Sequence, residues 1–211
     1  MEYTTDRGLN WTTRTFPTPQ VLYSQFVSPV TGFYFDISSG MYKTIDGGNH
    51  WASILPVATQ GQDFPFYFLD SLHGFTMIDN NFSKTVDGGA HWDLITSNVV
   101  IGNYTGFYKM QFLDSLNGYC GTKYGLYKTT DGGKTWTNSL SSTYGFIIPQ
   151  FFDVNNGYCL IGNAIYKTID GGHNWTISCR LGSGSFYGMH FIDMNTGLAC
   201  TTRDFVIKLG L

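Results

Sequence analysis

The sequence predicts an all-β chain folded as a five-bladed β-propeller, and three observations carry this prediction. An eight-residue motif, Thr-x-Asp-x-Gly-x-x-Trp, occurs five times along the 211 residues. A second motif, a hydrophobic pair followed by Asp-x-x-x-Gly and another hydrophobic residue, keeps step with the first. Aromatic residues make up 17% of the chain and 26 residues are glycine, a composition that favours strands joined by tight turns.

The first motif, called the Thr-Asp-Trp motif below, recurs at the period of propeller blades. Its aspartates are 40, 41, 44 and 39 residues apart, in the range typical of blades or solenoid repeats. We expect each Asp to accept hydrogen bonds from its own turn and each Trp to anchor the outer edge of a blade, so we assign both to architecture and not to catalysis. These residues are Asp6, Asp46, Asp87, Asp131 and Asp170, with Trp11, Trp51, Trp92, Trp136 and Trp175.

Each repeat divides into four short runs bounded by turn signals. In the third repeat we predict strands at 108–113, 119–122, 126–130 and 135–140. Four strands in about 40 residues are typical of one propeller blade. We place the five repeats at 17–58, 59–99, 100–141, 142–181 and 182–211, in a single domain covering residues 1–211.

The two ends of the chain predict how a ring would close. The last repeat has three predicted strands and no Thr-Asp-Trp motif, whereas residues 1–16 carry that motif without the strands before it. We therefore expect the N-terminal segment to complete the fifth blade, which would remove two exposed sheet edges. The alternative is that the repeats are a fragment of a larger ring.

Bulk properties exclude several classes of partner. The formal net charge is −3, and the 12 Lys and Arg residues are spread along the repeats, which predicts no binding to nucleic acid. No apolar run approaches the roughly 20 residues of a membrane-spanning helix, and the N-terminus lacks the layout of a signal peptide. Cys120 and Cys159 hold equivalent places in consecutive repeats, so we expect buried free thiols there. A bridge between Cys179 and Cys200 has no such support.

Runs such as the one from Leu126 to Trp136 resemble the Asp-box, or bacterial neuraminidase repeat, and the resemblance covers essentially the whole chain. Together with the second motif, the repeats are most similar to the photosystem II assembly factor propellers and their bacterial relatives. Sialidases and the sortilin ectodomain are more distant. The resemblance implies a propeller but no single activity, because such propellers include enzymes, receptors and assembly factors. It also implies an exported protein, secreted or periplasmic, although the chain shows no signal peptide.

The residues of an enzyme site are scarce. A sialidase site needs an arginine cluster and a glutamate, but Glu2 is the sole glutamate and one of the arginines lies in a Thr-Asp-Trp turn. Glycosidases need a pair of carboxylates, and the equivalent inner-strand positions carry Gln25, Tyr67, Gln111, Gln150 and His190. The unassigned carboxylates are Asp36, Asp63, Asp79 and Asp204. We therefore predict no catalytic residues, no metal site and no cofactor, with a glycoside hydrolase as the least favoured reading.

A non-catalytic binding or assembly scaffold is the leading prediction, with a protein or peptide as the partner. The loops at the end opposite the Thr-Asp-Trp turns vary between repeats, which favours them as the contact face. Aromatic rings beside amides and charges in these loops suit protein hot spots, or alternatively sugar rings in a lectin-like site. The candidate residues are Tyr104, Tyr124, Tyr144, Tyr187, Asn80, Asn163, Arg203 and Asp204. The sequence makes no prediction of the oligomeric state.

Overall fold

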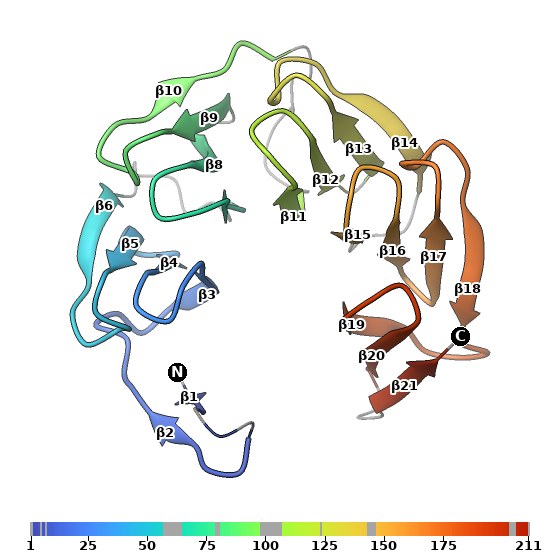
Figure 1. Ribbon diagram of the computed structural model, residues 1–211, viewed down its shortest axis with the longest axis horizontal. Coiled ribbons are helices and arrows are strands. Elements are labelled where there is room, and N and C mark those ends of the chain that lie inside the picture. The colour runs from blue at the N-terminus through green and yellow to red at the C-terminus, as the bar shows by residue number, and fades with distance from the viewer. Residues whose placement is uncertain are drawn as a thin grey trace. The chain divides into compact units, whose positions relative to one another are not determined.

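A computed structural model describes residues 2–4, 6, 8–56, 65–78, 81–97, 107–122, 124–142, 147–202 and 206–210. Strands are the regular elements of these residues, and four antiparallel sheets of four strands each follow one another along the chain (Figure 1). Within each sheet the strands pair in sequence order. The chain is therefore an all-β β-propeller with four-stranded blades, as the sequence predicts.

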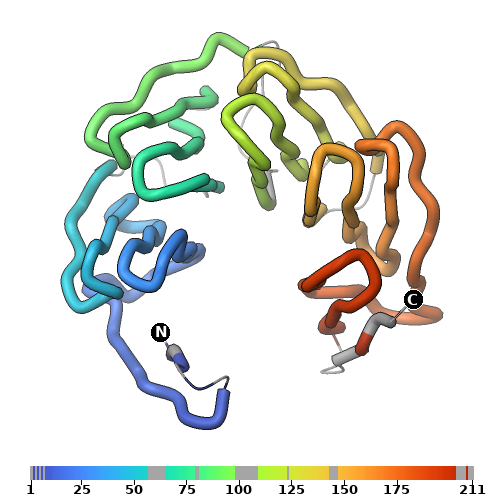
Figure 2. The backbone as a smooth tube through the Cα atoms, viewed as in Figure 1, coloured from blue at the N-terminus to red at the C-terminus, as the bar shows by residue number. Residues whose placement is uncertain are grey.

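The blades are named by their strands. The first contains β3 (Val21–Phe26), β4 (Gly32–Asp36), β5 (Gly40–Thr44) and β6 (Ala52–Pro56). The second contains β7 (Tyr67–Phe68), β8 (Gly74–Ile78), β9 (Asn81–Thr85) and β10 (Asp93–Leu94). The third contains β11 (Phe107–Phe112), β12 (Gly118–Thr122), β13 (Gly125–Thr129) and β14 (Thr137–Ser141). The fourth contains β15 (Ile147–Phe151), β16 (Gly157–Ile161), β17 (Ala164–Thr168) and β18 (Thr176–Arg180), whose path is orange in Figure 2.

Two smaller sheets hold the remaining strands. β19 (Phe186–Phe191), β20 (Thr196–Thr201) and β21 (Val206–Gly210) form a three-stranded sheet, and β1 (Glu2–Tyr3) pairs with β2 (Thr12–Thr13). Among the described strands these are separate sheets, so four blades are complete and a fifth is partial. Each of these two sheets contains a strand in the position of a blade's third strand. β1 pairs with the outer strand β2, and β21 pairs with the second strand β20.

The chain divides into two compact units. The first contains residues 1–64, 68–75 and 84–93, and the second contains residues 65–67, 76–83 and 94–211. The third and fourth blades and the sheet β19–β21 all belong to the second unit. The first unit contains β1, β2 and the first blade.

The predicted strand positions in the third blade are correct to within two residues. The main difference lies at the fourth strand, which begins at Thr137 and not at Thr135. The reason is local, because the Thr135 hydroxyl donates to Asp131 Oδ2 at 2.6 Å and Thr135 is thereby part of the turn.

Each Thr-Asp-Trp turn is held by its own side chains, and the turn around Asp131 is representative. Asp131 Oδ1 accepts the Thr135 N–H at 2.8 Å and the Thr129 hydroxyl at 2.9 Å. The Thr129 hydroxyl in turn accepts the Gly133 N–H at 2.9 Å. Gly132 and Gly133 have φ values of 73° and 90°, which only glycine adopts without strain. These hydrogen bonds hold the Asp131 carboxylate within its own turn, and the bridge through the Thr129 hydroxyl is an addition from the structure.

The glycine of the second motif has a packing role. A Cβ atom on Gly157 would lie 2.4 Å from Cδ1 of Phe151, so any side chain there would collide with the ring. Gly118 has the same relation to Phe112, at 2.6 Å from Cε1. The motif therefore lets the phenylalanine ring lie flat across the neighbouring strand, where it is buried.

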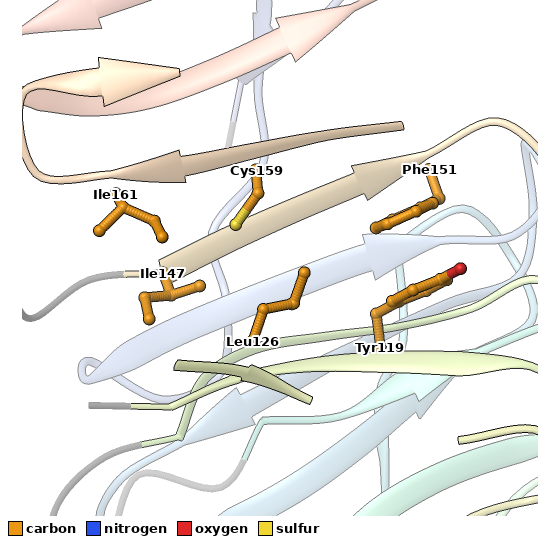
Figure 3. Close-up of a cluster of buried hydrophobic side chains, with 6 residues drawn as sticks. All are labelled: Tyr119, Leu126, Ile147, Phe151, Cys159 and Ile161. Atoms are coloured by element: carbon orange, nitrogen blue, oxygen red, sulfur yellow. The ribbon is translucent and has the colours of Figure 1, made fainter. Parts of the chain in front are cut away.

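Three pairs of neighbouring sheets share a set of three contacts, here described between the third and fourth blades. The Tyr119 ring stacks on Phe151 with centroids 3.5 Å apart (Figure 3). Gln111 Nε2 donates to the Phe151 carbonyl at 2.8 Å, and the Phe151 N–H donates to Gln111 Oε1 at 2.7 Å. Lys128 Nζ donates to the Gly171 carbonyl at 2.9 Å. We call this combination the blade joint.

Two further blade joints have the same composition. Tyr158 stacks on Phe191 at 3.8 Å, Gln150 exchanges two hydrogen bonds with the Phe191 backbone, and Lys167 donates to the Met194 carbonyl. In the first unit the same positions hold Phe33 on Phe68, Gln25 and Lys43. From the sequence, these glutamines stand out only as inner-strand positions without a carboxylate. A glutamine recurs at the equivalent position of the first strand in three repeats, and this recurrence is the sequence signal for a blade joint.

All four cysteines are free thiols. Cys120 and Cys159 are buried, as predicted, and burial raises the pKa of each thiol. Cys159 packs with Ile147 and Ile161 in the core between the third and fourth blades (Figure 3). These two cysteines therefore act as small apolar core residues.

Candidate functional site

The candidate site is one end of the sheets in the second unit, called the loop end below. Strands run alternately up and down, so the β12–β13 turn, the β16–β17 turn and the link from β18 to β19 all lie at the end opposite the Thr-Asp-Trp turns. Three of the predicted site residues lie there in the described part of the chain: Tyr124, Asn163 and Tyr187.

Tyr124 presents its ring from a turn with a fixed backbone. Its N–H donates to Thr122 Oγ1 at 3.1 Å, and its carbonyl accepts the Ser142 N–H at 3.1 Å. The residue is nevertheless 64% exposed. An exposed ring on a held backbone loses little conformational entropy when a partner covers it.

Tyr187 lies at a β-bulge at the start of β19. The pairing of β19 with β20 shifts between Phe186 and Gly188, which leaves Tyr187 as the extra residue, and it is 77% exposed. The same shift occurs on β3 around Leu22, which is also exposed. Bulges of this kind re-aim a side chain away from the ladder and often lie beside functional sites.

Asn163 forms hydrogen bonds that connect the β16–β17 turn to the link between β18 and β19. Its Nδ2 donates to the Leu181 carbonyl at 3.0 Å, and its own carbonyl accepts the Leu181 N–H at 2.9 Å. The next contact along the chain joins Gly162 to Phe186, whose N–H donates to the Gly162 carbonyl at 2.9 Å. The structure thus brings the Asn163 turn beside the start of β19, and the amide of Asn163 stabilises that arrangement.

The other predicted site residues lie outside the described residues. They are Tyr104, Tyr144, Asn80, Arg203 and Asp204. The unassigned carboxylates Asp63 and Asp79 lie outside them as well.

Asp36 is the remaining unassigned carboxylate, and it caps a turn. It is fully buried, with Oδ1 accepting the hydroxyls of Ser38 and Ser39 and Oδ2 accepting the Gln20 N–H. Burial alone would raise the pKa of Asp36, but these hydrogen bonds outweigh it and hold the pKa well below its usual range. A carboxylate held ionised by its own turn and shielded from solvent is unsuited to act as an acid or base.

The Thr-Asp-Trp aspartates are also held in the ionised form. The Asn174 N–H and side chain are the main donors that lower the pKa of Asp170 to about 2, and Asn10 does the same for Asp6. His50 Nδ1 lies 2.6 Å from Asp46 Oδ2 and His91 Nδ1 lies 2.7 Å from Asp87 Oδ2, so each histidine pairs with its own turn. In the part of the chain that the structure describes, no three His, Cys, Asp or Glu side chains gather as a metal site would require.

No protein-family model matches the sequence. No curated protein matches it in a sequence comparison. The described residues contain no helix with the length and apolar character needed to cross a membrane.

Solved structures show the fold. YCF48 from Cyanidioschyzon merolae matches with a TM-score of 0.69 at 16% identity, over 99% of this chain and 76% of that chain. An ancestral GH74 enzyme matches with a TM-score of 0.68 at 15% identity, over 95% of this chain and 31% of that chain. A catalytically inactive virginiamycin B lyase from Staphylococcus aureus, solved with quinupristin, matches with a TM-score of 0.64 at 10% identity, over 97% of this chain and 75% of that chain. The resemblance to assembly-factor and glycosidase propellers is thereby confirmed at the level of the fold.

Proposed function

We propose that the chain is a non-catalytic binding or assembly scaffold that takes a protein or peptide at the loop end of its blades. The observation that carries the proposal is the exposure of Tyr124 and Tyr187 on backbones that hydrogen bonds and a bulge hold in place. Tyrosine is enriched among the residues that dominate protein interfaces, because its ring supplies contact area and its hydroxyl a hydrogen bond. Rigid presentation reduces the entropic cost of binding.

The hydrogen bonds that the aspartate carboxylates accept within their own turns support a non-catalytic role. Asp114, Asp131, Asp153 and Asp170 all accept hydrogen bonds from the backbone N–H groups of their own turns. A retaining or inverting glycosidase instead needs two carboxyl groups facing each other across a bound sugar. The chain spans 31% of the GH74 enzyme to which it is similar, so that enzyme's activity does not carry over with the fold.

A glycan partner is the second candidate, and one observation weighs against it. A lectin-like site needs amide groups free to bond sugar hydroxyls beside the aromatic rings. The amide nitrogen of Asn163 is instead bonded to Leu181, as described above. A protein or peptide needs only the rings and the surrounding backbone, and it therefore fits this end of the second unit better.

The test is selection of peptides on the immobilised chain from a phage-displayed library, followed by calorimetry with the synthesised peptide. We expect the double variant Tyr124→Ala and Tyr187→Ala to bind it at least roughly 30-fold more weakly, the size of an interface hot spot. The matched control is Ile169→Ala, which is 71% exposed at the opposite end of the same unit and should bind unchanged. Equal affinity of the double variant and the wild type would refute the proposal, and a glycan array probed with the same variants tests the second candidate.

We also propose that the sheet β19–β21 is a fifth blade and that the N-terminal segment supplies its outer strand. Support comes from the first unit, where Arg14 Nη1 donates to the Gly47 carbonyl. Arg14 follows Trp11 by three residues, as Ser139 follows Trp136, and the Ser139 hydroxyl donates to the Gly172 carbonyl of the next blade at 2.6 Å. The N-terminal hairpin therefore contacts the first blade as the outer strands of a preceding blade would.

A further inference from the structure

Four aliphatic side chains lie exposed in the first unit, at the end of its blades that carries the Thr-Asp-Trp turns. They are called the tip patch below: Val30 (52% exposed), Ile45 (74%), Leu72 (49%) and Val86 (58%). Two come from the turns between the first and second strands of a blade, and two come from the Thr-Asp-Trp turns. In the first blade the Gly47 N–H donates to the Val30 carbonyl at 2.8 Å, and in the second the Gly88 N–H donates to the Leu72 carbonyl at 2.7 Å. The two tips of each blade are therefore held together by a backbone hydrogen bond.

The tips of the two blades are also joined to each other. Lys43 of the first blade donates from Nζ to the Ser71 carbonyl of the second at 2.9 Å. Ser71 directly precedes Leu72, and Lys43 lies two residues before Ile45. The tip patch is therefore one surface of the first unit.

The turns themselves do not require aliphatic side chains. In the third blade Thr130 precedes the aspartate of the Thr-Asp-Trp motif, where the first two blades have isoleucine and valine. In the fourth blade Asn155 holds the place of Leu72, and its carbonyl still accepts the Gly171 N–H at 2.7 Å. Among the four complete blades described, the first and second alone are aliphatic at both places. The turn geometry leaves this apolar surface unexplained, and exposed apolar patches mark interaction sites.

The rim of the tip patch is acidic. Asp46, Asp70 and Asp87 each lie within two residues of a tip-patch side chain, and their own side chains are 36%, 56% and 37% exposed. The His50 N–H is the main donor that holds the pKa of Asp46 well below its usual range, and the His91 N–H does the same for Asp87. These two carboxylates are therefore charged at neutral pH.

The negative charge of the chain is concentrated in the unit that carries the tip patch. The residues of the first unit include eight acidic and four basic ones, a formal charge of −4, whereas those of the second include seven acidic and eight basic ones, a charge of +1. Two of the four basic residues, Lys43 and Arg14, donate to backbone carbonyls of the turns. An apolar patch on an acidic unit is complementary to a partner that combines aliphatic side chains with positive charge.

We propose that the tip patch binds a basic amphipathic helix of a partner protein. The aliphatic side chains of such a helix recur every three or four residues along one face, and lysines or arginines beside that face reach the acidic rim. A second copy of this chain fits less well, because a symmetric contact would set the rim of one copy against the rim of the other. An anionic bilayer would repel the rim in the same way. The tip patch is separate from the loop end of the second unit, so the chain has two surfaces for two partners.

The test measures binding of a synthetic peptide to the full chain by calorimetry. The peptide contains leucine and lysine alone, with the leucines on one face of a helix of about four turns. We expect saturable binding to the wild type and at least roughly 30-fold weaker binding to a variant in which the tip patch is polar. That variant carries Val30→Asn, Ile45→Thr, Leu72→Asn and Val86→Thr. Each replacement is a residue that another repeat has at the same place, so the turns should still fold, and an unchanged Tm checks this.

The matched control makes the same exchanges in the other unit. Leu116 and Ile169 are exposed at the equivalent turns of the third and fourth blades, which belong to the unit with a charge of +1. Leu116→Asn with Ile169→Thr should leave the affinity for the leucine–lysine peptide unchanged.

The contribution of charge has its own variants. Asn49→Lys with Ala90→Lys adds positive charge to the rim, at the place where the turn of the third blade carries Lys134. We expect this pair to weaken binding about tenfold, whereas the neutral match Asn49→Gln with Ala90→Gln should not weaken it. A peptide with glutamate in place of lysine should not bind the wild type.

Three outcomes would overturn this inference. The first is equal affinity of the wild type and the polar tip-patch variant, and the second is equal binding of the lysine and glutamate peptides. The third is a dimer of the wild type in sedimentation that the polar variant does not form, which would assign the tip patch to a second copy. The double variant Tyr124→Ala and Tyr187→Ala should bind the leucine–lysine peptide as tightly as the wild type. Failure of this inference is thereby distinguished from failure of the proposed binding at the loop end.

Discussion

The joint between the third and fourth blades and the open face of β19–β21 share one backbone register and differ in burial. In the first, Tyr119 is covered by Phe151, and Gln111 satisfies the Phe151 backbone. In the second, Leu198 and His190 hold the same two positions and Leu198 is exposed. In both regions the strands pair within one sheet, but the central side chain is buried only where Phe151 covers it.

The largest expected effect separates the two regions by truncation of one ring. Phe151→Ala should lower the free energy of unfolding by about 3–5 kcal/mol, because it removes a buried aromatic ring and leaves a cavity under Tyr119. Leu198→Ala should cost less than about 1 kcal/mol, as expected for a half-exposed side chain. Urea unfolding followed by tryptophan fluorescence measures both. Similar costs for the two variants would mean that the end face is covered as fully as the internal joint.

The second comparison concerns the paired hydrogen bonds. Gln150→Met keeps the volume but leaves the N–H and C=O of Phe191 without their partner, at a cost of about 2 kcal/mol. His190→Met changes the equivalent position on the open sheet and should cost less than half as much. The same urea titration decides, and amide hydrogen exchange at Phe191 should speed up in Gln150→Met alone. Unchanged exchange there would show that the glutamine is not what protects this backbone.

The smallest expected effect is a change in stability at acidic pH. It concerns the fourth blade, which has a Thr-Asp-Trp turn, whereas the sheet β19–β21 lacks this motif. The pKa of Asp170 is lowered to about 2, chiefly by the Asn174 N–H. A depressed pKa means that its contribution to stability is complete above about pH 4, the unfolded value, and is lost as pH falls through 2. Asp170→Asn should therefore make the loss of stability between pH 4 and pH 2 shallower. Parallel losses in variant and wild type, from urea midpoints at pH 5, 3 and 2, would contradict this assignment.

Sequence reasoning predicted the blades well because their signals are local. The turn around Asp131 closes within eight residues, and Gly132 and Gly133 have the positive φ values that the motif implies. The strand bounds followed from the same turns. The threonine bridge within each turn was not predicted. The motif shows that a threonine recurs there, but it does not show which group its hydroxyl binds.

The candidate site was predicted less completely. Tyr124 and Tyr187 are exposed at the predicted end of the sheets, but the bulge that turns Tyr187 outward depends on pairing with β20 and leaves no mark in the sequence of β19. Asn163 was predicted as a ligand-binding residue, and its amide is used to fasten the link after β18. The residue type shows which hydrogen bonds a side chain can form, whereas its actual partner depends on which other segments of the chain pack beside it.

The all-β class, the four-stranded repeat and the self-contained turns could be predicted from the sequence, because each depends on residues within one repeat. Which of the repeated positions form blade joints depends on how the blades pack, and the sequence of one repeat does not show it. Gln111 and Phe151 are 40 residues apart and meet only when two blades pack. Leu198 has the same strand position as Tyr158 but is exposed, because a side chain is buried only where another surface packs against it.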